Sequence, residues 1–340
     1  MVAIQARRRN DGESIPIFND ASQPLRPFTY EPLDSYSNSD SFRLITIERS
    51  LNENDTLSCK LVSTEFGEKP RFRALSYMWG EDTANKTIML NGAEFHVRQN
   101  LWDALHCFRK SGMQSQFWVD AICINQNDIS ERNKQLMIMK RIYFRAESVV
   151  VWLGKKYERY KQVARARTDR VIFENIHTEG PQASDITSET TVRSEETLGS
   201  LNTESKDSDI LIADNEEREM VKELCTDGYW NRLWIIQEIG RVRQIEVRFG
   251  EIDMSWKAFI EVVILHENSH EGPLRLNSLL REKYSSIHTF RKLLSDHREA
   301  LCKEPRDKIY GLVGLAADTI GFTWTTTDLW SKYGRIQWSL

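Results

Sequence analysis

The sequence has no run of 18 apolar residues, and the basic residues Arg7, Arg8 and Arg9 are not followed by the apolar core of a secretion signal. Neither a membrane-spanning helix nor secretion is therefore expected. Its five cysteines are scattered without CxxC pairs, which argues against a disulfide framework and against a zinc site. Together these absences predict a reducing, intracellular location without membrane contact.

The chain also lacks a strong excess of charge of either sign. It carries 46 Lys and Arg against 50 Asp and Glu, a net charge of -4, so no global basic field would recruit nucleic acid. It has no GxxxxGK loop and no GxGxxG motif after a strand, which disfavours ATP hydrolysis and hydride transfer. Its seven histidines show no metal-ligand spacing, so no metal site is predicted.

Composition divides the 340 residues into segments. Residues 1–38 are polar and contain several prolines, so an extended lead-in is expected. The main domain is predicted over 39–254 and is interrupted at about 176–217 by a segment rich in Ser, Thr, Asp and Glu. Such a segment buries too little apolar surface to offset its ordering entropy, which predicts a disordered insert. Residues 255–317 are predicted to form a helical extension, and 318–340 an irregular tail.

Strand and helix patterns alternate through the main domain. This alternation predicts an α/β fold with a mostly parallel sheet flanked by helices. The pair Asn91-Gly92 between two short strand patterns adds a β-hairpin. Asn100 is the expected cap of a helix at 101–108, and Asp128 with Glu131 has capping-box spacing before the next helix. Strand patterns lie at 42–47, 57–64, 73–80, 87–90, 94–97, 117–126, 148–154 and 245–250.

The stretch Phe117–Gln126 is largely apolar on both alternating faces, which is typical of a strand buried in a parallel sheet. It carries one carboxylate, Asp120, and ends in the amides Asn125 and Gln126. Open α/β sheets usually bind ligands at the carboxyl ends of their strands, so these three residues are predicted to border a pocket. The alternative is a structural carboxylate followed by amides that cap the next helix.

Two further groups are candidates. Ser76, Tyr77, Trp79 and Gly80 lie at the end of the strand pattern 73–80, where a loop could receive a nucleotide and Trp79 could stack on its base. The alternative is a buried strand end anchored by a tryptophan.

The other group is Trp230, Trp234 and Glu238, which a helix would place on one face at four-residue steps. A carboxylate beside two indole rings is partly desolvated, as functional carboxylates often are. The alternative is that the tryptophans pack in the core while Glu238 pairs with a basic neighbour, Arg232 or Arg241.

Several sequence blocks together resemble the fungal heterokaryon-incompatibility (HET) domain. They are Ala74–Gly80, Trp118–Gln126 with Glu131-Arg132, Val150–Gly154, Trp230–Glu238 and Arg306–Tyr310. The resemblance implies a cytoplasmic domain that triggers programmed cell death when genetically different fungal cells fuse. It also implies a relation to the TIR-like fold, some of whose members cleave NAD.

In those NAD-cleaving enzymes a helical glutamate, often four residues after a tryptophan, is the catalytic group. The resemblance therefore points to Glu238 as catalytic, with Trp234 beside it and NAD as the substrate rather than a permanently bound cofactor. It further implies self-association and an upstream non-self sensor as partners. Two alternatives stay open: a non-enzymatic death or signalling adaptor with the same fold, and a degenerate copy with neither activity.

Overall fold

The structure is a computed structural model of the chain. It describes residues 26–33, 40–50, 52, 54–80, 83–166, 203–240, 242–267, 272–282, 288–302, 307–313 and 315–319. Most of the predicted lead-in 1–38, residues 176–202 of the predicted insert and nearly all of the tail 318–340 lie outside this description. None of the helices in the described part combines the length and hydropathy needed to cross a membrane.

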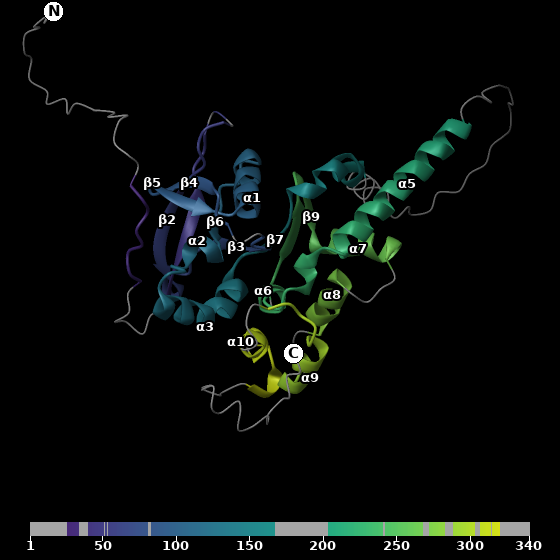
Figure 1. Cartoon of the computed structure of the whole chain (residues 1–340). Helices are drawn as coiled ribbons and strands as arrows, with labels where there is room; N and C mark the ends of the chain where they lie inside the picture. Colours follow the sequence, from purple (N-terminus) through teal and green to yellow (C-terminus); the bar gives the residue numbers. More distant parts are fainter. Residues whose placement is uncertain are drawn as a thin grey trace, which may run out of the picture.

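Nine strands form one sheet in the described part of the chain (Figure 1). They are β1 (Ser41–Ile47), β2 (Ser58–Glu65), β3 (Phe72–Tyr77), β4 (Lys86–Leu90), β5 (Ala93–Val97), β6 (Gln116–Trp118), β7 (Val149–Gly154), β8 (Ile245–Phe249) and β9 (Ile252–Ser255). Their order across the sheet is β5-β4-β2-β1-β6-β3-β7-β8-β9.

Helices lie between consecutive strands from β5 to β8, and four more follow β9 in the described part of the chain. The α-helices are α1 (Gln99–Lys110), α2 (Asp120–Cys123), α3 (Ile129–Arg145), α5 (Thr203–Cys225), α6 (Ile235–Ile239), α7 (Trp256–His266), α8 (Pro273–Arg281), α9 (Phe290–Asp296) and α10 (Asp307–Val313). Four 3-10 turns are η1 (Phe66–Glu68), η2 (Lys155–Tyr160), η3 (Gly228–Asn231) and η4 (Ala317–Thr319). The predicted α/β class is therefore confirmed.

The sheet is mixed rather than mostly parallel, so that part of the prediction is wrong. The central strands β6, β3, β7 and β8 pair in parallel, as do β2 and β4. The pairs β1·β2, β1·β6, β4·β5 and β8·β9 are antiparallel. Short connections explain three of these reversals, because parallel neighbours need a longer crossover.

The hairpin and several strands are where the sequence predicts them. β4 and β5 pair directly around Asn91 and Gly92, whose φ angles of 51° and 78° suit a tight hairpin turn. Strand β9 was not predicted, and β8 is consequently not the last strand. The described part of the predicted helical extension 255–317 contains α7, α8, α9 and α10.

The stretch Phe117–Gln126 is not one strand. β6 ends at Trp118, and Asp120–Cys123 forms the helical turn α2. A short run that is apolar at nearly every position does not distinguish a buried strand from a buried helical turn, and here the turn is formed. Asp120 consequently opens a helical turn just beyond the end of β6.

The helix expected to carry Trp230, Trp234 and Glu238 is divided into separate elements. α5 ends at Cys225, and the side chain of Asp227 accepts a hydrogen bond from the Tyr229 amide and caps the separate turn η3. Trp230 therefore lies in η3 and not on a helical face with Glu238. Trp234 is still one helical turn before Glu238, since the Glu238 amide donates to its carbonyl at 3.1 Å.

α5 begins inside the range predicted to be a disordered insert. It starts at Thr203 and continues through residue 217, so the described part of that range is helical. The apolar residues Met220, Val221 and Leu224 are buried at its carboxyl end, where the helix packs against α7. Docking of this apolar face supplies the burial that the preceding polar composition lacks.

Two predicted caps are formed differently. The Asp128 side chain accepts from the Glu131 amide at 3.0 Å, which confirms the start of α3. The Glu131 carboxylate does not complete a capping box but forms a buried ion pair with Arg43. Asn100 lies inside α1, where it accepts from the Trp152 indole at 2.9 Å and donates to the Met78 carbonyl at 2.6 Å.

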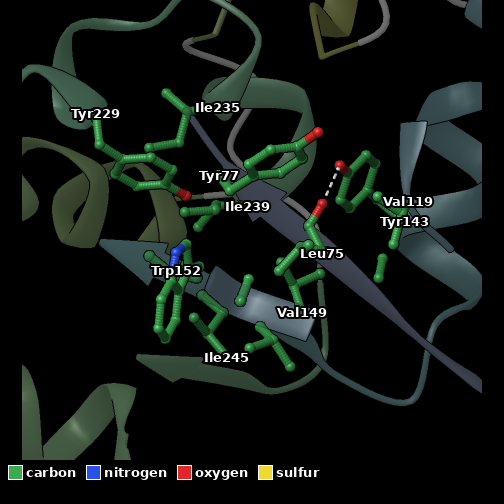
Figure 2. Packing of buried hydrophobic residues seen from close by; sticks show 14 of the residues in the cluster. Leu75, Tyr77, Val119, Tyr143, Val149, Trp152, Tyr229, Ile235, Ile239 and Ile245 are labelled. Carbon is green, nitrogen blue, oxygen red and sulfur yellow. Dashed lines mark hydrogen bonds between the residues drawn. The ribbon is translucent and has the colours of Figure 1, made fainter. Parts of the chain in front are cut away.

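The core surrounds β3 and β7, and every residue of β7 is buried. Figure 2 shows this cluster, with Tyr77, Tyr143 and Tyr229 on the side of the strands that faces α6. Tyr143 of α3 donates to the Leu75 carbonyl at 2.9 Å, which joins the helix to β3. Burial of each large apolar side chain contributes about 1.5–3 kcal/mol. The core thus fixes the carboxyl end of β3 firmly.

Candidate functional site

Glu238 of α6 is a buried carboxylate, with 3% of its side chain exposed. It accepts a hydrogen bond from the Ser76 hydroxyl near the end of β3. Arg232 pairs with it through two contacts, at 3.0 Å to Oε1 and 3.3 Å to Oε2. Both oxygens are therefore engaged in this structure. Glu238 thus pairs with a basic neighbour, Arg232, as the alternative interpretation of the sequence predicts.

Ser76 links the carboxylate to a tyrosine. Its hydroxyl lies 2.5 Å from the Tyr229 hydroxyl, so carboxylate, serine and tyrosine form a chain of hydrogen bonds. Burial, followed by the negative charge of Glu238, raises the pKa of Tyr229 well above its usual value. Burial alone would lower the pKa of Arg232, yet the adjacent carboxylate raises it above its usual value. At neutral pH the tyrosine is neutral and the arginine is charged.

Asp120 is a second carboxylate within electrostatic reach of Glu238. Its Oδ2 accepts from the Trp79 indole at 2.8 Å, and its Oδ1 accepts from the Ala121 amide at 2.7 Å. Burial and the charge of Glu238 raise the pKa of Asp120 to about 6, although the Trp79 hydrogen bond and Arg232 act in the opposite direction. The two carboxylates have different partners: an indole and a backbone amide for Asp120, a hydroxyl and a guanidinium for Glu238.

The structure brings most of the predicted site residues together. Ser76 and Tyr77 are the last two residues of β3 and Trp79 follows it, and burial together with the charge of Asp120 raises the pKa of Tyr77. Gln126 donates its amide to the Asp120 carbonyl at 2.9 Å. These groups meet at the carboxyl ends of β3 and β6, the edge where open α/β sheets bind ligands.

Three predicted site residues are less closely joined to this cluster. The Asn125 amide donates to Glu131 at 2.7 Å, and its side chain accepts from the Asn127 amide, so it organises the start of α3. Gly80 is exposed and has a φ of 77°, a conformation that favours glycine. Trp234 is partly buried and packs against the core.

Trp79 is more constrained than a free stacking platform. Its indole N–H is bound to Asp120, and the Arg98 guanidinium lies 4.9 Å from the centre of its ring. A base that stacks here must use the other ring face or displace Arg98.

Tyr229 and Tyr143 were not predicted as site residues. Both tyrosines are buried, and the charge of Glu238 is among the causes that raise the pKa of each. The expected helix gives no reason to place Tyr229 in the site. The position of Tyr229 depends on the turn η3, which Asp227 caps. The dipeptide Asp227-Gly228, a common turn signal, is the sequence feature that indicates this break.

Cys123 is buried and is a poor candidate for a nucleophile. Burial raises the pKa of the Cys123 thiol to about 12, so it stays protonated at neutral pH and is a poor nucleophile. Among the described residues, no three His, Cys, Asp or Glu side chains are placed to hold a metal ion.

Comparison with known proteins bears on the same segment. Residues 72–238 match the family model described as "Heterokaryon incompatibility protein (HET)". The chain carries a HET domain. The matched range begins with β3 and ends at Glu238, so Ser76, Asp120 and Arg232 all lie within the HET domain.

A curated relative extends this similarity. The chain is similar to "Heterokaryon incompatibility protein 6, OR allele" of Neurospora crassa, at 24% identity over 86% of the chain. The chain spans about half of that protein, 49% of its length. No solved structure matches the chain significantly, so the fold of this HET domain rests on the structure described above.

Proposed function

We propose that this chain acts in heterokaryon incompatibility and that its HET domain kills the cell by hydrolysing NAD at Glu238. The observation that carries the proposal is the buried Glu238 carboxylate, bound to Ser76 at the carboxyl end of β3 and close to Asp120. The family match and the printed name of the Neurospora relative support the incompatibility role. The TIR-like relation that the sequence resemblance implies supports NAD as the substrate.

The chemistry asks for little besides a placed carboxylate. The bond between C1′ of the ribose and the nicotinamide nitrogen breaks, and the electron pair leaves with nicotinamide, which is already cationic in NAD. The ribose becomes oxocarbenium-like, water adds to C1′ with loss of a proton, and ADP-ribose is the second product. In this scheme the Glu238 carboxylate stabilises the positive ribose, while the hydroxyls of Ser76 and Tyr229 orient the ribose hydroxyls.

The arrangement described here is a closed one. Arg232 and Ser76 occupy both oxygens of Glu238, so a ribose can approach only after Arg232 releases the carboxylate. Self-association and an upstream non-self sensor belong to the same proposal as the events that bring about this opening.

The same ion pair favours a second candidate function. A carboxylate that is permanently paired with Arg232 stabilises the fold and has no catalytic task, as expected of a non-enzymatic death or signalling adaptor. In that case the HET domain acts through protein contacts alone.

One cellular experiment separates these functions. Wild type, Glu238→Gln and Glu131→Gln are compared at equal levels of folded protein, because each substitution alters a buried ion pair, and NAD and viability are followed over time. Glu131 is the matched control, because it is also buried and paired with an arginine. The proposal predicts NAD loss and death with wild type and Glu131→Gln but not with Glu238→Gln. Death without NAD loss, or with Glu238→Gln unchanged, supports the adaptor; no death with any chain indicates a degenerate copy.

A further inference from the structure

The segment that carries Arg232 and Glu238 is held on two sides. One side faces β3, through the hydrogen bonds of Tyr229 and Glu238 to Ser76. The other faces a C-terminal clamp, which we define as α8, α9, α10 and residues 297–302. Figure 1 shows α8 and α10 beside α6, and both helices contact it.

The clamp holds the backbone on each side of Arg232. The Leu301 amide donates to the Asn231 carbonyl at 2.7 Å, and the Leu233 amide donates to the Leu301 carbonyl at 2.9 Å. These two bonds form a short parallel bridge between Arg232 and Leu301. The Leu301 side chain is 62% exposed, so this contact depends on its backbone rather than on its packing.

Side chains and a close approach reinforce the bridge. Arg275 of α8 donates to the Trp230 carbonyl at 3.1 Å. Gly311 of α10 lies so close to Leu233 that a Cβ atom there would be 3.1 Å from the leucine side chain. Both contacts restrain the chain within two residues of Arg232.

We propose that the C-terminal clamp holds Arg232 on Glu238 and that release of the clamp frees the carboxylate. The functional part of this inference depends on the proposed NAD hydrolysis, whereas the mechanical part does not. The HET match ends at residue 238, so the clamp lies beyond the matched segment and regulates it from outside. In this proposal the backbone hydrogen bonds of Leu301 fix the backbone around Arg232 and so keep the Arg232 side chain on the Glu238 carboxylate.

The experiment uses the full chain and two substitutions at one position. Leu301→Pro removes the amide that donates to Asn231, whereas Leu301→Ala keeps that amide and changes only an exposed side chain. Hydrogen exchange of the Leu233 amide reports on the clamp, and nicotinamide release from NAD reports on the site. We expect Leu301→Pro to speed both by about tenfold and Leu301→Ala to change neither.

A second variant keeps the test decisive if Leu301→Pro does not fold, as judged by circular dichroism. Gly311→Val crowds Leu233 from α10 and should loosen the same segment. Unchanged exchange at Leu233 in the folded variants overturns the clamp, whatever NAD does. Faster exchange while every chain leaves NAD intact overturns the proposed hydrolysis and supports the clamp. Faster exchange with hydrolysis at the wild-type rate overturns the regulation alone.

Discussion

Two buried arginine–glutamate pairs in the described part of the chain have the same chemistry but different neighbours. Arg43 binds Glu131 through its two terminal guanidinium nitrogens, Nη1 and Nη2, at 2.6 and 2.9 Å. The other hydrogen bonds of this pair are to backbone groups, the carbonyls of Cys123 and Glu31 and the amide of Asn125, and the Tyr30 ring lies 4.9 Å from the Arg43 guanidinium. The pair therefore ties residues 26–33, β1, α2 and α3 into one unit.

Arg232 and Glu238 are surrounded by side chains instead. Ser76 binds the carboxylate, Tyr229 binds Ser76, and Asp120 lies within electrostatic reach. Backbone partners are fixed in place and do not titrate, whereas hydroxyl and carboxyl groups can turn, exchange protons or be replaced by a ligand. The neighbours of a buried ion pair, rather than the pair itself, therefore separate a structural role from a functional one.

The largest expected effect breaks the structural pair. Arg43→Ala leaves the buried Glu131 carboxylate without its cation and should lower the free energy of unfolding by about 3–5 kcal/mol. Arg232→Ala should cost less, about 1–3 kcal/mol, because Glu238 keeps Ser76 and the arginine was already 17% exposed. Urea denaturation measures both. Equal losses would remove the distinction between the pairs.

A pH dependence should come from Asp120. Its pKa of about 6 in the folded protein, against an ordinary value of 3.8, means that the folded state binds this proton more tightly than the unfolded chain. The stabilisation is complete below pH 3.8 and is lost as the pH rises through 6, on the order of 3 kcal/mol. Denaturation at pH values across this window should show the slope in wild type and its loss in Asp120→Asn. A slope that survives in the variant would assign it to another group.

A smaller effect is expected at Ser76. Ser76→Ala removes the hydroxyl that Tyr229 contacts and one partner of Glu238, which keeps Arg232, and should cost about 1–3 kcal/mol of stability. Ser148→Ala is the matched control, because the buried Ser148 hydroxyl has no hydrogen-bond partner among the described residues. Thermal unfolding of the two variants should differ accordingly. A loss in Ser148→Ala as large as in Ser76→Ala would contradict the hydrogen-bond chain.

The smallest expected effect is a change in the pKa of Asp120, which a titration measures. Glu238→Gln removes the negative charge that, after burial, raises the pKa of Asp120, so that pKa should fall in the variant. Glu131→Gln should leave it unchanged. Carbon-13 spectra of the Asp120 carboxyl group report both values, and an unmoved Asp120 in Glu238→Gln would show that the two carboxylates do not interact.

The sequence predicts individual elements of the fold better than their pairing. The alternation in residues 42–47 and the Asn91-Gly92 turn are local signals, and β1 and the β4–β5 hairpin form there. The placement of β1 between β2 and β6 depends on contacts far apart in the chain, so no local pattern reveals the antiparallel half of the sheet. The run after Trp118 is apolar in either conformation, which is why its helical turn was missed.

The site shows the same division. Ser76, Asp120 and Glu238 were each selected from local features, and the fold joins Ser76 to Glu238 across 162 residues. The sequence suggests Arg232 only as an ion-pair partner of Glu238. It does not indicate a site role for Tyr229, because the capped turn η3 replaces the expected helix. Residue types and strand ends can thus be predicted, whereas the partner of each polar group depends on how the segments fold together.

The most direct measurement is nicotinamide release from NAD by the purified full chain, with wild type, Glu238→Gln and Glu131→Gln at equal folded concentration. The account predicts slow release by wild type and Glu131→Gln, because Arg232 must first leave Glu238, and a further decrease of about 100-fold or more in Glu238→Gln, since one charged group that stabilises the reacting centre is lost. Equal release by Glu238→Gln and wild type would contradict it.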